Sequence, residues 1–154
     1  MLDQTIGFIG AGRMARALAG GFVRAALVGA GQVIAADPDS TARTQFSRDV
    51  PGCLVTEDNM EVLGHSNVVF LSVKPQNIST ATATLRAGIT DEKLIVSIAA
   101  GVTLGRLTSE LGTERIVRVM PNTPCLVGRS ASGYCLAPGA TEADGRLVDQ
   151  LLDS

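Results

Sequence analysis

The chain has 154 residues, of which 45% are apolar, 18% charged and 3% aromatic, and its formal net charge is −2. This length and composition are typical of one folded domain with a single core, and they exclude a disordered, collagen-like or disulfide-stapled protein. The slightly acidic balance and the scarcity of aromatic rings argue against a nucleic-acid partner, because such proteins need a basic face or stacking platforms.

Short apolar, β-branched runs alternate along the whole chain with segments of helical periodicity. Strands are predicted at residues 5–9, 32–36, 53–55, 67–72, 93–98, 115–120 and 131–136. Helices are predicted at residues 14–27, 59–64, 103–111 and 142–152, with two more opening near residues 40 and 74. Strands that are apolar throughout and separated by helices indicate an α/β fold. We therefore expect a doubly wound, mostly parallel sheet of the dinucleotide-binding (Rossmann) type, filling a single domain over residues 1–154.

Two helix boundaries follow from local chemistry. We expect the first helix to run to about Leu27 and to be stopped by Gly29 and Gly31, because glycine is the usual residue just past a helix end. In the turn Asp37-Pro38-Asp39-Ser40, the Ser40 hydroxyl is expected to cap the following helix.

The cysteines and the N-terminal segment bear on compartment and metal binding. Three cysteines and the single histidine, His65, show no CxxC or zinc-ligand spacing, so the sequence predicts no metal site. Unpaired cysteines are typical of a reducing compartment. The cysteines are Cys53, Cys125 and Cys135.

The apolar stretch at residues 6–30 follows no basic segment and contains three arginines, so it resembles neither a signal peptide nor a membrane span. We predict a cytoplasmic protein with no membrane partner.

The junction between the first strand and the first helix carries the dinucleotide fingerprint Gly10-x-Gly12-x-x-Ala15. Gly10 permits a tight turn, Gly12 lets the backbone approach a pyrophosphate, and Ala15 is small enough for close contact between helix and strand. The helix N-terminus offers free N–H groups and the positive end of its dipole to the phosphates. The alternative is that the glycines only make a tight turn, and the strand–turn–helix context disfavours it.

Asp37 lies at the end of the second predicted strand, 25 residues beyond Gly12. A carboxylate there would accept hydrogen bonds from the adenosine ribose hydroxyls and repel a 2′-phosphate, which favours NADH over NADPH. A second interpretation stays open, since Asp-Pro-Asp-Ser is also a good turn and cap sequence. Arg13 and Arg43 are basic groups able to meet a 2′-phosphate, so the predicted cofactor is NADPH or NADH with a lean toward NADH.

Four segments in order resemble those of the pyrroline-5-carboxylate reductase family, and the resemblance covers the whole chain. Each segment alone is weak, but four in the same order and spacing are specific. They are Phe8-Ile9-Gly10-Ala11-Gly12, Phe70-Leu71-Ser72-Val73-Lys74-Pro75, Ser97-Ile98-Ala99-Ala100-Gly101-Val102-Thr103 and Arg118-Val119-Met120-Pro121-Asn122-Thr123-Pro124.

The resemblance implies an oxidoreductase of proline biosynthesis, which reduces the C=N bond of a small imine, 1-pyrroline-5-carboxylate, with hydride from NAD(P)H. Its implied cofactor residues are Gly10, Ala11, Gly12, Arg13, Met14, Ala15, Asp37, Asn59, Ser72, Val73, Lys74, Pro75, Ile98, Ala99 and Ala100. Asn122, Thr123 and Pro124 are expected near the substrate. Pro75 should also keep Lys74 out of helical geometry. No residue stands out as the catalytic acid.

The resemblance also implies a helical domain that this chain lacks and through which the longer protein forms a homo-oligomer. We therefore expect a cofactor domain that binds dinucleotide with little turnover alone, and that exposes apolar surface including Leu147 and Leu151. Two other functions remain open. One is a different imine or ketone reductase, such as a coenzyme F420-linked NADP reductase or a β-hydroxyacid dehydrogenase. The other is a non-catalytic NAD(P)-binding module.

Overall fold

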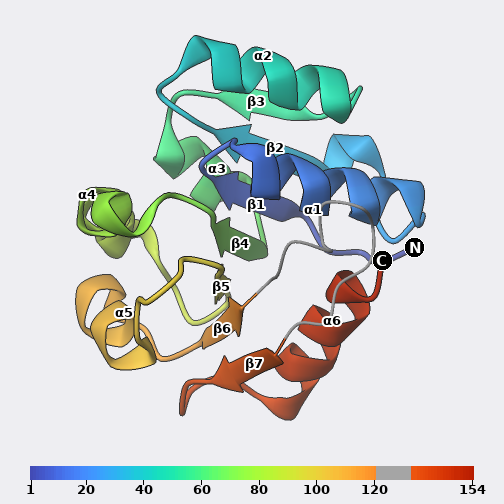
Figure 1. Cartoon of the computed structure of the whole chain (residues 1–154). Helices are drawn as coiled ribbons and strands as arrows, with labels where there is room; N and C mark the ends of the chain where they lie inside the picture. Colours follow the sequence, from blue (N-terminus) through green and yellow to red (C-terminus); the bar gives the residue numbers. More distant parts are fainter. Residues whose placement is uncertain (121–132) are drawn as a thin grey trace.

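The computed structural model describes residues 1–120 and 133–154, and within them it contains one seven-stranded sheet (Figure 1). The strand order is β3-β2-β1-β4-β5-β6-β7. The strands are β1 (Ile6–Ile9), β2 (Val33–Ala36), β3 (Leu54–Thr56), β4 (Val68–Leu71), β5 (Leu94–Ser97), β6 (Ile116–Met120) and β7 (Gly133–Leu136).

Neighbouring strands run parallel except β6 and β7, which pair antiparallel at one edge. The chain winds from β1 outward to β3 and then returns to β4 on the other side of β1, so the order reverses between β1 and β4. Ile9 is in register with Ala36 on one side and with Leu71 on the other, so the carboxyl ends of these three strands lie level. The predicted doubly wound, mostly parallel fold is confirmed.

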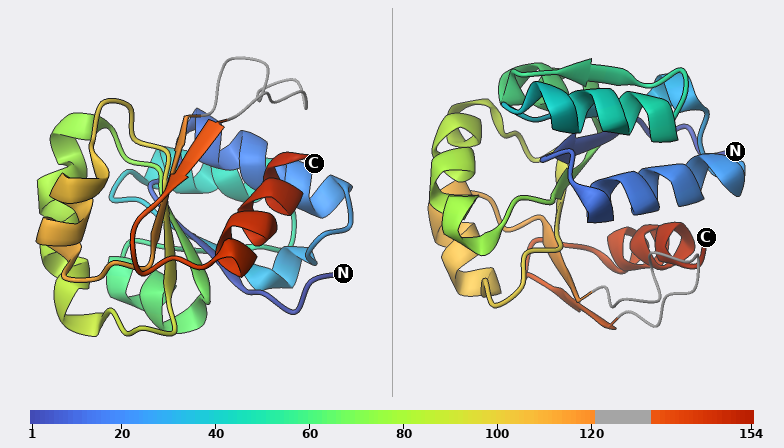
Figure 2. Two further views of the ribbon diagram at one scale, coloured as in Figure 1. Left: turned by 90° about the horizontal axis from the view of Figure 1, so that it is seen from below. Right: turned by 45° about the horizontal axis from the view of Figure 1, so that its top comes forward.

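Helices cover both faces of the sheet (Figure 2). One face carries α1, α2 and α6, and the other carries α3, α4 and α5. The bounds are α1 (Arg13–Arg24), α2 (Ser40–Asp49), α3 (Asn59–His65), α4 (Ile78–Leu85), α5 (Leu104–Leu111) and α6 (Glu142–Leu152), with 3₁₀ turns η1 (Ala30–Gln32), η2 (Pro75–Asn77) and η3 (Arg86–Gly88). No helix in the described ranges is long and apolar enough to cross a membrane.

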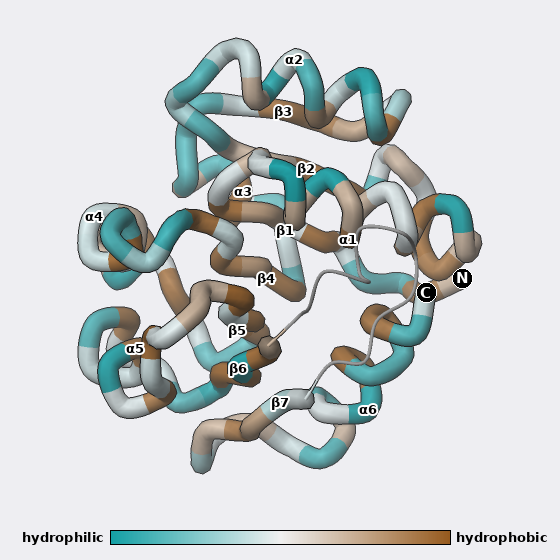
Figure 3. The backbone as a smooth tube through the Cα atoms, viewed as in Figure 1, coloured by the Kyte–Doolittle hydropathy of each residue, from teal (hydrophilic) through white to brown (hydrophobic). Residues whose placement is uncertain are grey.

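Hydrophobic residues are concentrated in the central strands (Figure 3). On the α1 side, the core is built around the chain's four phenylalanines, all fully buried. The Phe8 ring centroid lies 5.1 Å from that of Phe70, 5.8 Å from that of Phe46 and 6.3 Å from that of Phe22. Aromatic pairs at these separations add to the stabilisation from buried area. The four phenylalanine rings thus lie together, and they pack α1 and α2 against β1 and β4.

The first helix ends earlier than its periodicity indicates. It stops at Arg24, and Ala26 adopts a left-handed φ of 55°. The N–H of Leu27 then donates to the Phe22 carbonyl, and that of Ala26 to the Val23 carbonyl, which together form a Schellman motif. The prediction that Gly29 and Gly31 end this helix is therefore wrong, because an alanine takes the left-handed position normally filled by glycine.

Two further expectations are also corrected. Asp39, and not Ser40, caps α2: its carboxylate accepts a hydrogen bond from the Thr41 N–H at 2.9 Å, and Ser40 is the first helical residue. In α6, Leu151 is fully buried against the sheet, so it exposes no apolar surface; Leu147 is partly buried. Side chains i and i+4 lie on one helix face, but only the tertiary packing decides how much of that face is covered.

Candidate functional site

The β1–α1 turn needs glycine at its first position. Gly10 has a φ of 98°, and a Cβ built there would lie 2.8 Å from the Ser72 carbonyl oxygen. Its N–H donates to the Ala36 carbonyl at 2.8 Å, which continues the pairing with β2 beyond the end of β1. The turn is therefore packed directly against the ends of both neighbouring strands.

The N-terminus of α1 is open to an anion. Gly12 is its N-cap, no side chain caps it, and the first turn has no acidic residue. A Cβ at Gly12 would meet no atom within 4 Å, so bare backbone faces open space there. The unpaired N–H groups and the helix dipole together favour a bound phosphate. Ala15, the third position of the motif, is fully buried and packs the helix onto the sheet.

Asp37 faces the glycine turn from the end of β2. Its carboxylate is partly buried, and Oδ2 accepts a hydrogen bond from the Ala11 N–H at 2.9 Å. Oδ1 accepts from the Asp39 N–H at 2.9 Å, so the turn chemistry considered from sequence is present. Arg43 donates to the carbonyls of Asp37 and Pro38 at 2.7 and 3.2 Å, which places a guanidinium beside the same turn.

The end of β4 completes the floor of the site. The Ser72 hydroxyl donates toward the carbonyls of Gly10 and Ile9, at 2.9 and 3.1 Å. Lys74 is exposed and extended, with φ −62° and ψ 149°, and Pro75 opens η2. The prediction that proline keeps Lys74 out of helical geometry is confirmed, and its carbonyl accepts from the Asn77 N–H at 2.8 Å.

These elements enclose a cavity of about 490 Å³ at the carboxyl ends of β1, β2 and β4. Ligands of doubly wound sheets bind at this place, where the strand order reverses. Seven of the predicted cofactor residues line it: Gly10, Gly12, Asp37, Asn59, Ser72, Val73 and Lys74. Sequence reasoning missed the wall formed by α4 and the residue before it, which consists of Asn77, Thr80, Ala81 and Thr84. Their spacing of three and four residues, with small or polar side chains, is the signal that marks such a face.

The other predicted cofactor residues lie outside this cavity. Arg13 lines a separate shallow hollow with Arg16 and Arg24. Ala99 is buried, Ile98 and Met14 pack at the core boundary, Pro75 and Ala100 are exposed, and the Ala11 N–H is taken by Asp37. The predicted substrate residues Asn122, Thr123 and Pro124 lie outside the residues that the structure describes.

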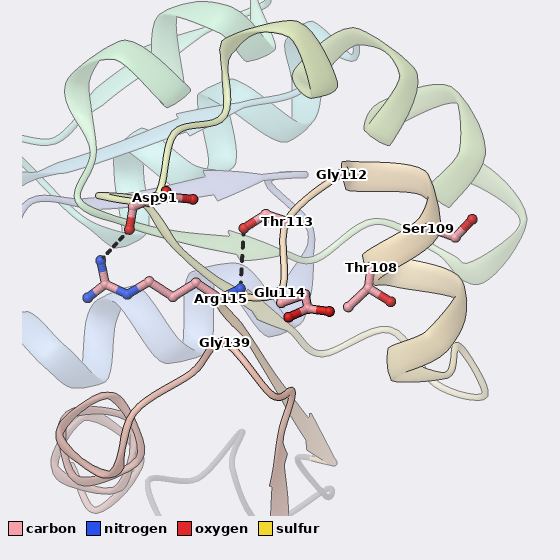
Figure 4. Close-up of a pocket in the computed structure, with 8 residues that line it drawn as sticks. All are labelled: Asp91, Thr108, Ser109, Gly112, Thr113, Glu114, Arg115 and Gly139. Carbon is pink, nitrogen blue, oxygen red and sulfur yellow. Dashed lines mark hydrogen bonds between the residues drawn. The ribbon is translucent and has the colours of Figure 1, made fainter.

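A second hollow, of about 650 Å³, lies at the opposite end of the sheet, where β5 and β6 begin (Figure 4). Arg115 crosses it, donating to the Asp91 carbonyl and forming a bidentate pair with Asp144, with its Nη2 2.8 Å from Oδ1. Burial raises the pKa of Asp144, but hydrogen bonds from Arg115 and from Thr141 outweigh it and hold the pKa below its usual value. The Arg115 guanidinium is therefore engaged in joining α6 to the segment just before β6.

The fold and the open helix N-terminus at the strand switch point define a dinucleotide-binding domain. The family model described as NADP oxidoreductase, coenzyme F420-dependent, matches residues 5–101, and the chain belongs to this family. The family description supports a nicotinamide dinucleotide, NAD(P)H, as the ligand.

The chain is also similar in sequence to named pyrroline-5-carboxylate reductases. The chain is 41% identical over 152 residues to a pyrroline-5-carboxylate reductase of Pisum sativum, covering 99% of this chain and 55% of the relative. It is 36% identical over 155 residues to pyrroline-5-carboxylate reductase 2 of Homo sapiens, covering 98% and 48%. The resemblance inferred from the four motifs is confirmed. The chain spans about half the length of the curated relatives it matches.

Solved structures give the same result. A pyrroline-5-carboxylate reductase from Coxiella burnetii superposes with a TM-score of 0.91 at 28% identity, covering 99% of this chain and 56% of the other. The Plasmodium falciparum pyrroline carboxylate reductase, solved with NADP bound, superposes with a TM-score of 0.86 at 28% identity, covering 99% and 55%. A prephenate dehydrogenase from Aquifex aeolicus, at 16% identity and a TM-score of 0.77, shares the fold.

Proposed function

We propose that this chain is the cofactor-binding part of an enzyme that reduces 1-pyrroline-5-carboxylate to L-proline with hydride from NAD(P)H. One observation carries the proposal: an uncapped helix N-terminus faces a cavity at the strand switch point, in a chain 41% identical to a named pyrroline-5-carboxylate reductase. The named relatives are about twice as long as this chain, and we propose that the whole enzyme forms a homo-oligomer through a domain that this chain lacks.

Each described residue of the site has a binding or positioning role in this proposal. The first turn of α1 holds the pyrophosphate with backbone N–H groups, which cost no reorganisation when the anion binds. We propose that Asp37 and Asn59 meet the adenosine half of the cofactor, and that Ser72, Val73 and Lys74, which line the cavity just after β4, meet its nicotinamide half. The nicotinamide ring supplies the hydride when the cofactor is bound. Asn122, Thr123 and Pro124 are proposed to meet the imine.

The reaction is tested by a steady-state assay of the complete gene product with pyrroline-5-carboxylate and NADH or NADPH. Proline formation at a rate far above that of the 154-residue chain alone is the expected result. Turnover with another imine or ketone only would indicate a different reductase. Dinucleotide binding without any turnover would indicate a non-catalytic module, and either result would overturn the proposal.

For cofactor choice, we propose a preference for NADH, because the Asp37 carboxylate would repel a 2′-phosphate. Arg43, beside the same turn, offsets part of that repulsion. The ratio of NADH to NADPH affinity should fall about tenfold in Asp37→Ser, since one repulsive charge at the 2′ position is removed. An unchanged ratio would show that Asp37 does not face the ribose. Arg43→Gln is the matched variant, and it should shift the ratio in the opposite direction.

A further inference from the structure

A single peptide group in the glycine turn is held at both of its polar ends by side chains. The carbonyl of Gly10 accepts a hydrogen bond from the Ser72 hydroxyl at 2.9 Å, and the N–H of Ala11 donates to Asp37 Oδ2 at 2.9 Å. Carbonyl and N–H belong to the same planar unit, so one strand neighbour grips each end. β1 lies between β2 and β4 (Figure 1). Asp37 follows β2 and Ser72 follows β4, so the two side chains reach the turn from opposite sides.

The Gly10–Ala11 peptide needs a restraint from outside the turn, because its first residue is a glycine. Gly10 has a φ of 98°, and glycine populates several backbone regions at similar cost, so rotation of the Gly10–Ala11 peptide meets little intrinsic resistance. A rotated peptide would break both of these hydrogen bonds and would change the direction in which the turn leads into α1. Ala11 is fully buried, so the hydrogen bonds at this peptide form largely away from water, where they are stronger.

The hydrogen bond to Asp37 also determines which N–H groups of the turn remain available to a ligand. The Ala11 N–H is taken by Asp37, which leaves the unpaired N–H groups at the start of α1 for a pyrophosphate. A carboxylate has about four acceptor positions, and Asp37 uses two of them on the Ala11 and Asp39 N–H groups. The rest remain for ribose hydroxyls, so one side chain joins the ribose end of the cavity to the phosphate-binding turn.

We infer that Asp37 and Ser72 are positioning residues that clamp the Gly10–Ala11 peptide, so that Asp37 supports diphosphate binding independently of any contact with the ribose. The inference rests on the dinucleotide site of the proposed function and not on the reaction. Absence of turnover with pyrroline-5-carboxylate would therefore leave it standing.

The test uses ADP and 2′,3′-dideoxy-ADP as probes, titrated calorimetrically into the 154-residue chain. Dideoxy-ADP keeps the diphosphate and has no ribose hydroxyl for Asp37 to recognise. We expect Asp37→Ala to weaken dideoxy-ADP about tenfold, and Ser72→Ala to weaken it by a few-fold, since each loses one hydrogen bond that preorganises the turn. The double variant should lose less than the product of the two, because both side chains hold one peptide.

Asp39→Ala is the matched control. It removes a carboxylate of equal charge two residues away, which accepts a hydrogen bond from the Thr41 N–H, and it should leave the dideoxy-ADP affinity within about twofold. Asp37→Asn keeps one acceptor oxygen and should restore part of the affinity. Melting of each variant, followed by circular dichroism, separates loss of binding from loss of fold.

Hydrogen exchange of the Ala11 amide, measured by NMR without ligand, gives a second readout. Exchange should be about tenfold faster in Asp37→Ala and unchanged in Asp39→Ala, because the Ala11 N–H donates to the Asp37 carboxylate and the Asp39 carboxylate accepts from Thr41. If Asp37→Ala weakened ADP but left both the dideoxy-ADP affinity and the Ala11 exchange rate unchanged, Asp37 would act on the ribose alone and the clamp would be refuted.

Discussion

Alanine substitutions at Gly10 and Gly12 should separate folding from binding. At Gly10, the new Cβ would lie 2.8 Å from a backbone oxygen and 2.9 Å from a backbone carbon of Ser72, on a residue whose φ is 98°. The positive φ costs about 1–2 kcal/mol for an L-residue, and backbone displacement at β4 adds a similar amount. We expect Gly10→Ala to lower the free energy of unfolding by about 2–4 kcal/mol.

At Gly12 the same methyl group meets nothing within 4 Å, and the backbone φ of −77° suits any residue. Gly12→Ala should therefore keep the free energy of unfolding within about 1 kcal/mol, and the lower entropy of the unfolded chain acts in favour of the variant. The methyl group would stand over the uncapped N-terminus of α1, so NADH affinity should fall at least about tenfold.

Urea unfolding followed by far-ultraviolet circular dichroism measures the first effect, because the chain has no tryptophan for fluorescence. With a slope of about 2 kcal/mol per molar urea, Gly10→Ala should move the midpoint down by about 1–2 M. The fluorescence of bound NADH measures the second effect. Equal destabilisation by both variants, or unchanged NADH affinity in Gly12→Ala, would refute the assignment of a packing role to Gly10 and a binding role to Gly12.

Three further predictions concern stability. Asp144→Ala removes the partner of Arg115 and the hydrogen bond that the Asp144 carboxylate accepts from the Thr141 N–H at the start of α6, and it should cost about 2–4 kcal/mol in urea unfolding. Glu142→Ala, with a 94% exposed side chain in the same turn, should cost under about 0.5 kcal/mol. The folded pKa of Asp144 lies below its usual value, so its stabilising effect is complete above about pH 4 and is lost as pH falls through the lowered pKa. The free energies of unfolding of the wild type and Asp144→Ala should therefore converge in acid. A difference between them that grew in acid would contradict this. Phe8→Ala should cost about 3–5 kcal/mol, because the ring contacts the other three phenylalanines, and a cost under about 1 kcal/mol would show that the core collapses around the gap. Ala26→Gly should raise the melting temperature by about 2–4 °C by relieving a left-handed φ at the end of α1, and a lower melting temperature would disprove strain there.

Features that depend on adjacent residues could be predicted from the sequence. The periodicity of residues 142–152 predicts α6 with its observed bounds, because an amphipathic pattern and a Thr141 cap are both local. The glycine motif predicts the β1–α1 turn for the same reason. The end of α1 is different: Schellman geometry at a non-glycine residue depends on how Leu27 and Phe22 pack, and that information is not local.

Some residues of the candidate site could likewise be predicted from the sequence, and others could not. Gly10, Gly12, Asp37 and Ser72 are identifiable from their places at strand ends, since parallel strands present their carboxyl ends at one edge. The α4 wall of the cavity was missed because its residues carry no motif, only small or polar side chains on one helical face. Which side chains a cavity includes depends on the angle at which a helix packs.

Residues a few positions apart are enough to predict the alternation of strands and helices, the glycine turn and the open N-terminus of α1. The hydrogen bonds of the Asp37 carboxylate, in contrast, depend on how distant parts of the chain pack together. Its partner Ala11 lies 26 positions away, and Ser72 reaches the same peptide from 62 positions away on the other side. Such contacts exist only once β2 and β4 pair on either side of β1, and that pairing is a property of the whole sheet.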